Sequence, residues 1–205
     1  MSRALIALAL FALAPLACAA DTGTIEGQIA IQEAAPPADP AHVPFSDVVV
    51  YLNGFAPGTT FPPPTQEVSL TQRKKRFVPY ILPIQAGTTV RFPNDDDIFH
   101  NVFSVSRDQQ FNIGRYPKGP GKTHVFTRVG QVRVFCDVHS FMKAHILVLP
   151  SPHFTQPDRS GHFRLDGVPT GSYWVVSWHD RLKNPEQKPI TVAAGQTVKV
   201  DLTIK

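Results

Sequence analysis

The sequence predicts an all-β protein made of two β-sandwiches. Short segments of alternating apolar and polar residues, rich in Val, Ile, Thr and aromatic residues, follow one another from residue 24 to residue 204. Such alternation is typical of strands with one buried face. The chain also holds 13 Gly and 20 Pro, which favour turns between short strands. No long segment has the 3.6-residue apolar period of a helix.

The predicted strands form three groups along the chain. Two strands, 24–31 (TIEGQIAI) and 47–52 (DVVVYL), are separated by the Pro-rich segment 34–40. A second run of prolines at 61–64 precedes the middle group, 66–70, 77–84, 88–92, 101–105, 123–126, 131–135 and 144–149. The last group is 161–165, 173–178, 189–192 and 197–204. The segments are enriched in β-branched residues, and Gly, Pro, Asn or Asp stands nearby.

The number of strands in each group predicts the domain organisation. Residues 66–150 hold enough strands to close a small sandwich. Residues 151–205 hold only four strands, and so short a piece is marginal as an independent domain. We therefore predict a discontinuous second domain, residues 22–60 with 151–205, into which the middle domain is inserted. The alternative is simple succession, with 21–150 as one domain and 151–205 as the next.

Residues 1–20 are predicted to be a signal peptide. Arg3 precedes an apolar run over 4–14 that is too short to span a membrane, and small residues follow at 17–20. A cleaved signal peptide predicts a secreted or periplasmic protein. No other apolar run in the sequence is long enough to be a transmembrane segment. A lipid anchor at Cys18 is the alternative, which Pro15, three residues before that cysteine, disfavours.

Charge and motifs narrow the classes of function. The net charge of +4 becomes +3 once Arg3 is removed with the signal peptide, so the chain is only mildly basic, and we predict no nucleic-acid partner. The sequence has no nucleophile and base pair, no phosphate-binding glycine loop and no paired catalytic carboxylates at an informative spacing. We therefore predict that the protein is not an enzyme.

Residues 136–142 (CDVHSFM) carry the strongest chemical signal. Cys136, His139 and Met142 bring a thiolate, an imidazole and a thioether into seven residues, a donor set that suits copper. The chain has two cysteines, so removal of Cys18 with the signal peptide leaves Cys136 as the sole thiol, and an intramolecular disulfide is impossible. An inert buried thiol and a core-filling methionine are the structural alternatives.

The missing ligand is expected to be a second histidine. His100 is the best candidate, because it ends a polar turn and opens an apolar segment, which predicts a position near the edge of a sandwich. An exposed turn histidine is the alternative. With His100, four protein ligands would leave no open position for a substrate, which favours electron transfer over catalysis.

These residues resemble a known family. The segment 85–94 (QAGTTVRFPN), then His100-Asn101, and then 130–142 with its Cys-x-x-His-x-x-Met spacing are similar to the plastocyanin and amicyanin group of cupredoxins. The resemblance covers about residues 66–150. It implies a Greek-key β-sandwich with one type 1 copper ion per chain, held by His100, Cys136, His139 and Met142. It also implies that the Asn101 amide ties the two ligand-bearing loops together, and that Phe141 adds to the apolar surroundings.

A second resemblance concerns the rest of the chain. Residues 158–173 (DRSGHFRLDGVPTGSY) and the opening segment 23–29 (GTIEGQI) are similar to the carboxypeptidase regulatory-like domain, a transthyretin-like sandwich. In that family a strand like 23–29 comes first, which supports the discontinuous arrangement.

Three further features are less specific. The basic run 73–76 (RKKR) is interpreted as a solvated loop, with docking of an acidic partner as the alternative. The acidic run 95–97 lacks the spacing of a calcium loop and is interpreted as a polar turn. Whether His153 and His179 bind a second metal stays open.

The leading hypothesis is a type 1 copper protein that carries single electrons between redox partners, such as a dehydrogenase, a cytochrome or an oxidase. A copper-delivery protein would use the same ligands but would exchange the metal readily. A second alternative is a scaffold whose regulatory-like sandwich binds a partner or glycan, with the copper domain as an accessory.

Overall fold

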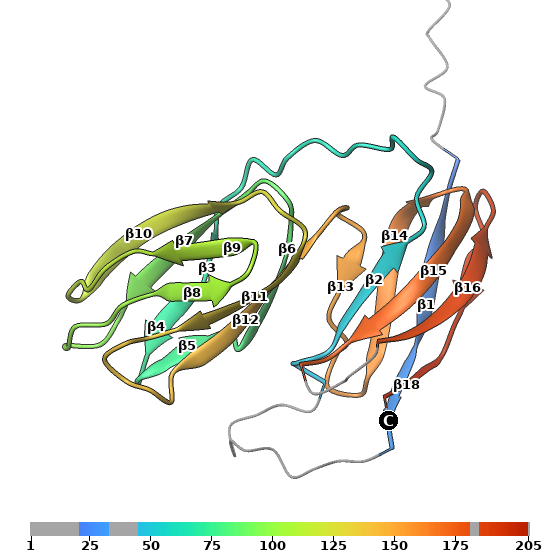
Figure 1. The fold of residues 1–205 in the computed structure, drawn as a ribbon. Coiled ribbons are helices and arrows are strands. Elements are labelled where there is room, and N and C mark those ends of the chain that lie inside the picture. The colour runs from blue at the N-terminus through green and yellow to red at the C-terminus, as the bar shows by residue number, and fades with distance from the viewer. Residues whose placement is uncertain (1–20, 33–44, 181–184, 205) are drawn as a thin grey trace, which may run out of the picture.

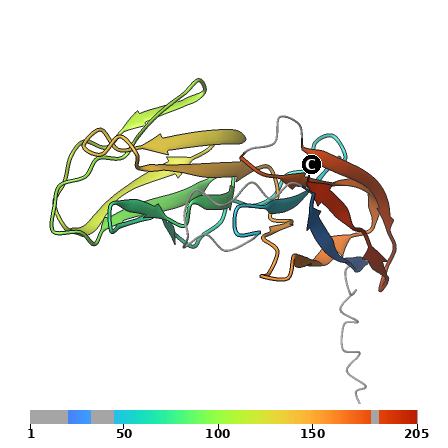
Figure 2. The same ribbon diagram turned by 90° about the horizontal axis from the view of Figure 1, so that it is seen from below.

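The computed structural model describes residues 21–32, 45–180 and 185–204. The predicted signal peptide, with Cys18, and the whole Pro-rich segment 34–40 lie outside them. All regular elements of the described residues are β-strands, so the all-β fold class is confirmed. The described part of the chain holds no helix long and apolar enough to cross a membrane. The strands form two β-sandwiches that lie side by side in both orthogonal views (Figures 1 and 2).

The first sandwich contains the strands from β3 to β12. One sheet has the order β10-β7-β4-β5, with β3 also paired to β7, and the other has the order β6-β12-β11-β8-β9. The strands of the first sheet are β3 (Val68–Ser69), β4 (Thr71–Arg73), β5 (Arg76–Val78), β7 (Thr88–Asn94) and β10 (Gly119–Phe126). Those of the second are β6 (Ile81–Gln85), β8 (Phe103–Ser106), β9 (Gln109–Asn112), β11 (Gly130–Phe135) and β12 (Lys143–Leu149).

The core of the first sandwich follows from the alternation along its strands. In β7 every second residue is buried, from Thr88 to Asn94, and in β11 Val132 and Val134 are fully buried. These side chains pack with Phe126 and Ile146 into one cluster that reaches Cys136 and Met142. The hydrophobic core therefore extends up to the ligand loop predicted from the sequence.

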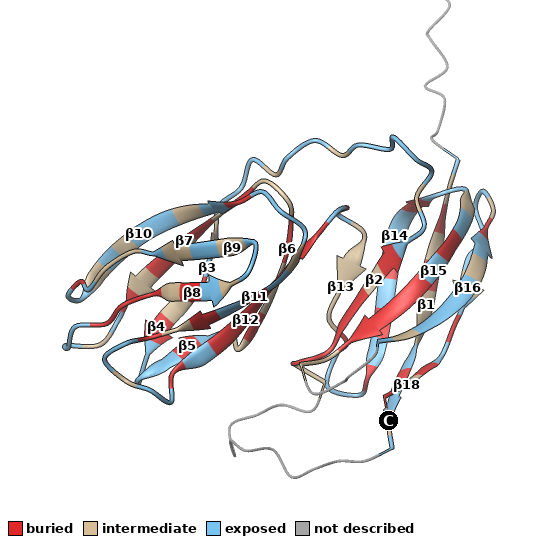
Figure 3. Ribbon diagram, in the orientation of Figure 1, coloured by how far each residue is buried: buried red, intermediate tan, exposed pale blue. Residues whose placement is uncertain are grey.

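The second sandwich combines strands from the beginning and the end of the chain. One sheet has the order β14-β1-β17, with β18 also paired to β1, and the other has the order β13-β2-β15-β16. Its strands are β1 (Thr22–Ile31), β2 (Val49–Asn53), β13 (Phe154–Thr155), β14 (His162–Pro169), β15 (Gly171–Trp178), β16 (Glu186–Val192), β17 (Thr197–Lys199) and β18 (Leu202–Ile204). Figure 3 shows buried residues along β14 and β15, whose side chains share a core with Ile25 and Leu52.

A glycine in β1 allows a close approach of the carboxy-terminal segment. A Cβ atom at Gly27 would lie 1.8 Å from the carbonyl oxygen of Val200. Val200 lies between β17 and β18, both of which pair with β1 in parallel, and its amide donates to the Glu26 carbonyl at 2.9 Å. The glycine of the opening segment is therefore required by backbone packing.

The sandwiches are joined by the chain connections from β2 to β3 and from β12 to β13, and by direct contact. The Pro-rich connection from β2 to β3 runs along the top of Figure 1 and is held by a hydrogen bond of 2.9 Å from Gln85 Nε2 to the Pro62 carbonyl. The sandwiches also contact each other directly. Val49 and Trp178 of the second sandwich form a buried cluster with residues of β6 and β12, namely Ile81, Leu147 and Leu149. We call this group the inter-sandwich cluster.

The strand prediction was wrong in several details, and it missed the short strands β4 and β13. Residues 77–84 were expected to form one strand, but they divide between β5 and β6 in different sheets, and Pro79 lies at the break. Residues 197–204 likewise divide into β17 and β18. Strand β9 was missed because its sequence, QQFN, shows no apolar alternation; it forms through its hairpin with β8.

Candidate metal centre

The ligand loop 136–142 is the connection of a β-hairpin. Strands β11 and β12 are antiparallel, with Phe135 opposite Lys143, so the seven residues between them must reverse the chain. The Met142 amide donates to the His139 carbonyl at 3.0 Å, and the Cys136 amide donates to the Met142 carbonyl at 3.4 Å. The hairpin thus brings Cys136, His139 and Met142 to one end of the sandwich.

His100 reaches the same end from the connection between β7 and β8. Its backbone forms a β-bridge with Tyr116: the His100 amide donates to the Tyr116 carbonyl at 3.2 Å, and the Tyr116 amide donates to the His100 carbonyl at 2.9 Å. The side chain is fully buried. Both the position and the rotation of this imidazole are therefore restrained.

The donor atoms of three of the four predicted ligands converge. Nδ1 of His100 lies 3.2 Å from Nδ1 of His139 and 3.8 Å from Sγ of Cys136. All three donor atoms lie within 4.8 Å of one another. Met142 is 1% exposed and belongs to the same buried cluster as Cys136.

These separations fit a single metal ion. Two nitrogens at about 2.0 Å from one ion, at an angle near a right angle or slightly wider, lie about 3 Å apart. A sulfur at about 2.3 Å and a nitrogen at about 2.0 Å that subtend about 120° lie roughly 3.8 Å apart. The His100, His139 and Cys136 donors match both separations, so the residues fit a trigonal His2Cys site.

Asp96 holds the second nitrogen of His100. Its Oδ2 lies 2.9 Å from His100 Nε2, which leaves Nδ1 directed toward Cys136 and His139. The same carboxylate accepts hydrogen bonds from the backbone amides of Lys74 at 2.6 Å and Lys75 at 2.7 Å. Burial acts to raise the pKa of Asp96, but these hydrogen bonds and the one to His100 outweigh it and lower that pKa.

Asn101 connects the loop of His100 to that of Cys136. Its backbone amide points at the Cys136 sulfur at 3.5 Å, and its side chain hydrogen-bonds the carboxylate of Asp137. Asp137 also pairs with Arg115 at 3.3 Å. Burial acts to raise the pKa of Asp137, but the hydrogen bonds from Arg115 and Asn101 lower it overall. The backbone and the side chain of Asn101 thus contact Cys136 and Asp137, both of the ligand loop.

His139 lies on the outer side of the group. Burial is the main cause that lowers the pKa of His139, and the nearby His100 and Lys75 lower it further. The imidazole is therefore neutral near pH 7, as metal ligation requires. Phe141 lies beside it, with 5.9 Å between the ring centroids, and is 65% exposed. Phe141 therefore covers the outer side of His139 and remains in contact with solvent.

Exposed apolar side chains lie in the two loops that carry His139 and His100. Val138 and Phe141 come from the ligand loop, and Ile98 and Phe99 come from the loop that precedes His100. Their exposed fractions range from 38% for Ile98 to 65% for Phe141. We call these four residues the apolar rim. Scattered apolar residues are ordinary on a protein surface, but a group around one site is typical of an interaction surface.

Sequence reasoning missed the role of one acidic residue. The run 95–97 was interpreted as a polar turn, yet Asp96 holds His100, while Asp95 and Asp97 pair with Arg73 and Lys118. The available signal was an aspartate four residues before a histidine already taken as a ligand. A carboxylate behind a metal-binding histidine is a common partner.

The structure does not bring His153 and His179 together in one group. His153 packs against Phe55 and Phe61, with 5.7 Å between ring centroids in each case. His179 lies with two carboxylates, Asp47 and Asp180.

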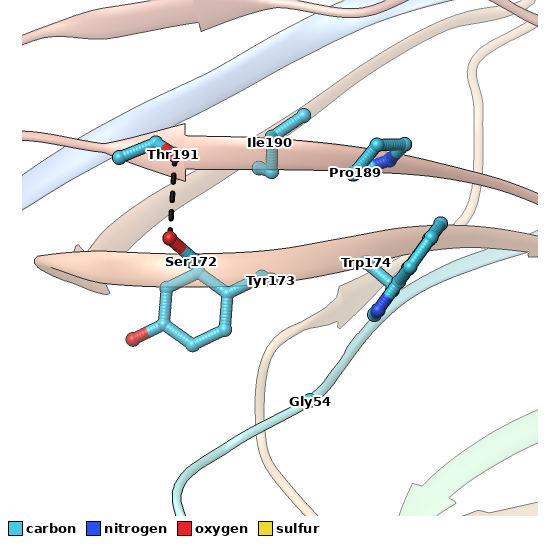
Figure 4. A pocket seen from close by; sticks show the side chains of 7 residues that line it. All are labelled: Gly54, Ser172, Tyr173, Trp174, Pro189, Ile190 and Thr191. Carbon is cyan, nitrogen blue, oxygen red and sulfur yellow. Dashed lines mark hydrogen bonds between the residues drawn. The ribbon is translucent and has the colours of Figure 1, made fainter.

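A separate hollow lies on the outer face of the second sandwich. Its volume is about 420 Å³, and Figure 4 shows its lining. Trp174 stands beside Pro189 and Ile190, and the hydroxyls of Ser172 and Thr191 lie 3.3 Å apart. Trp174 is 42% exposed. An exposed indole beside hydroxyl groups can stack on the apolar face of a ligand and hydrogen-bond its polar edge.

Comparison with known proteins finds both resemblances that the sequence indicated. The carboxypeptidase regulatory-like domain family matches residues 130–205. The matched range differs from the second sandwich at its beginning. It starts in β11, although β11 and β12 pair with strands of the first sandwich, and it leaves out β1 and β2, which pair with β14 and β15. No curated protein sequence matches the chain.

Several solved structures are similar to part of this chain. A reduced Cu(I) form of an amicyanin variant is 22% identical, covers 40% of this chain and 81% of its own, and has a TM-score of 0.38. A purple cupredoxin from Nitrosopumilus maritimus is 30% identical. The match covers 37% of this chain and 84% of the cupredoxin, with a TM-score of 0.35. A Cu-containing nitrite reductase from Thermus scotoductus is 27% identical. The match covers 47% of this chain and 25% of the reductase, with a TM-score of 0.40.

Proposed function

We propose that this chain is a type 1 copper protein that carries single electrons, with His100, Cys136, His139 and Met142 as the copper ligands. The observation that carries the proposal is the convergence of two imidazole nitrogens and one thiolate sulfur, with 3.2 Å and 3.8 Å between them, at the buried end of a β-sandwich. A trigonal His2Cys set with a weak axial Met is the blue-copper arrangement.

The donors favour electron transfer because they form a closed set. Bound copper would supply the Cu(I)/Cu(II) redox couple, in which the ion gains or loses one electron. Cys136 and Met142 are 3% and 1% exposed, and His100 is fully buried, so water has little access from their sides. A site filled by four protein ligands offers no position to a substrate. His100 and its Asp96 support would keep the geometry similar in both oxidation states.

Electrons would enter and leave through His139. It is the least buried of the four proposed ligands, and Phe141 of the apolar rim lies beside its ring. A redox partner, such as a dehydrogenase, a cytochrome or an oxidase, would cover this rim and bring its own centre close to the His139 ring. Lys74 and Lys75, whose amides hold Asp96, lie beside the same end and would favour a partner with an acidic surface.

Absorption and electron paramagnetic resonance spectra of the purified protein with Cu(II) test the proposal. We expect an intense thiolate-to-copper band and a small copper hyperfine splitting in the parent, and loss of the band in Cys136→Ser. A colourless parent with an ordinary tetragonal copper signal would overturn the assignment. A blue form that loses copper rapidly to a chelator would favour copper delivery over electron transfer.

The domain organisation is part of the proposal. We infer a copper domain over residues 66–150 and a second domain made of 22–60 with 151–205. The pairing of β1 with β14 and of β2 with β15 supports this division. We also propose that residues 1–20 are a signal peptide that directs the chain to the periplasm or outside the cell. Mass spectrometry of the mature protein would reveal the cleavage site, or a lipid on Cys18.

A second candidate function rests on the hollow beside Trp174. The exposed indole with the Ser172 and Thr191 hydroxyls favours binding of a glycan or a peptide partner by the second sandwich. Binding to an immobilised glycan set would be measured for the parent, Cys136→Ser and Trp174→Ala. Retention in Cys136→Ser with loss in Trp174→Ala would support a scaffold role. Absence of binding by the parent would remove this candidate.

A further inference from the structure

Asp47 and Asp180 lie opposite each other at one end of the second sandwich. Strands β2 and β15 are antiparallel, with Trp178 opposite Val49. Two more residues in the same register bring Asp180 opposite Asp47, just before β2 begins and just after β15 ends. His179 lies next to Asp180 in the chain, and the ligand atoms of all three residues lie within 4.8 Å of one another.

The group is largely buried and one of its oxygens lacks a hydrogen-bond partner. Asp47 is 4% exposed, and the side chains of Asp180 and His179 are 10% and 14% exposed. The hydroxyl of Tyr80 donates to Asp180 Oδ2 at 2.8 Å. The other oxygen, Asp180 Oδ1, is buried and accepts no hydrogen bond, and it lies 3.4 Å from Nδ1 of His179. An unsatisfied buried carboxylate oxygen requires an explanation.

A cation accounts for the arrangement. Like charges directly opposite on neighbouring strands repel, and the repulsion grows with burial. A metal ion between the carboxylates would turn that repulsion into attraction and would satisfy Asp180 Oδ1. Two ligand atoms at about 2.0 to 2.1 Å from a tetrahedral ion lie roughly 3.3 Å apart, close to the separation of Asp180 Oδ1 and His179 Nδ1.

We propose that Asp47, His179 and Asp180 bind a divalent transition-metal ion of the Zn²⁺ class at a second site. One imidazole and two carboxylates suit Zn²⁺ or Co²⁺, whereas Ca²⁺ and Mg²⁺ prefer oxygen ligands alone. With one oxygen from each carboxylate, water would complete a tetrahedral ion.

The site lies beside the contact between the sandwiches. Val49 and Trp178 belong to the inter-sandwich cluster, and they lie two residues from Asp47 and Asp180 along the chain. Tyr80, at the start of the first sandwich's β6, donates to Asp180 across this contact. A bound ion would therefore fix the end of β15 to the turn before β2 and would hold Asp180 in place for Tyr80.

Metal binding is tested in a background that lacks the proposed copper centre. In the full chain carrying Cys136→Ser and His139→Gln, we expect one equivalent of Zn²⁺ to bind and to raise the melting temperature. Co²⁺ should give d–d absorption without a thiolate-to-cobalt band, because the site has no sulfur ligand. This test does not depend on whether the copper proposal holds.

Two independent variants then identify the ligands. Asp47→Asn with Asp180→Asn, and separately His179→Gln, should each lower the Zn²⁺ affinity by at least about tenfold. Asparagine at 180 keeps an oxygen acceptor for Tyr80, so the fold is retained. The matched controls are Asp166→Asn and His162→Gln, which are exposed residues of the same sandwich and should leave the affinity unchanged. No bound equivalent in the background chain, or equal affinity in all variants, would overturn the proposal.

Discussion

Nε2 of His100 lies 2.9 Å from Oδ2 of Asp96, and the same carboxylate accepts hydrogen bonds from the backbone amides of Lys74 and Lys75. The turn between β4 and β5 is thus linked, through Asp96, to a proposed copper ligand. Both lysines have positive φ angles, 52° and 58°, which direct their amides at one carboxylate. The His100 ring is therefore oriented before any metal binds.

Asp96→Ala should weaken copper binding without unfolding the protein. Loss of a carboxylate behind a ligating histidine commonly lowers metal affinity by about 10- to 100-fold. Competition with a copper chelator measures the change. Asp97→Ala is the matched control, because Asp97 is exposed and pairs only with Lys118 among the described residues. Equal affinities in both variants would show that Asp96 does not support the site.

Met142→Gln should lower the reduction potential and keep the protein coloured. Met142 is buried beside Cys136, where it would be the long axial ligand. An amide oxygen stabilises Cu(II) more than a thioether does, and the axial ligand tunes the potential of such sites. Voltammetry gives the potential and absorption gives the colour. An unchanged potential would mean that Met142 only fills the core.

Trp178→Ala should destabilise the protein far more than Trp174→Ala, although both residues lie in β15. Trp178 is 9% exposed within the inter-sandwich cluster, and truncation of such a residue costs about 3–5 kcal/mol. Trp174 is 42% exposed, so its truncation should cost about 1 kcal/mol or less. Urea unfolding followed by circular dichroism measures both. Similar costs would argue against a stabilising contact between the sandwiches.

The metal-free protein should lose stability as the pH falls, in part through His153. Burial against Phe55 and Phe61 lowers the pKa of His153, so the unfolded chain binds the proton more readily. The contribution of neutral His153 to the free energy of unfolding is complete above the ordinary pKa of about 6.5. It is lost as the pH falls through the pKa of His153 in the folded state.

His153→Phe should reduce this loss, because it keeps an aromatic ring and removes the titrating group. Urea midpoints at about pH 8 and about pH 5 give the comparison, with His162→Gln as the exposed control. His124, whose pKa is also lowered by burial, would still contribute to the loss in both chains. The prediction would be contradicted if the urea midpoint of His153→Phe fell between the two pH values by as much as the midpoint of the parent.

The sequence predicts the fold class and the ligand loop because both depend on local patterns. Alternation along segments such as 131–135 is enough to identify a strand, and the proposed ligands Cys136, His139 and Met142 fall in one short connection. The partners of these residues depend on tertiary contacts. That Asp180 would lie opposite Asp47 follows only from the register of β2 and β15, which are distant in sequence.

The same limit applies to the missed and divided strands. Strand β9 has a single apolar residue, Phe111, so its sequence shows no alternation, and it pairs with β8. The run 77–84 has continuous apolar character, and only its division between two sheets shows that it contains two strands. Local propensity cannot separate one strand from two when a proline lies between similar segments.

Strand β12 connects the two ends of the first sandwich. It starts directly after Met142 in the ligand loop, and its far end supplies Leu147 and Leu149 to the inter-sandwich cluster. Seven residues of extended chain span roughly 23 Å and resist stretching along their length. A change in the seating of the second sandwich would therefore be transmitted along β12 to the axial side of the proposed copper site. We expect the reduction potential to sense what the second sandwich binds.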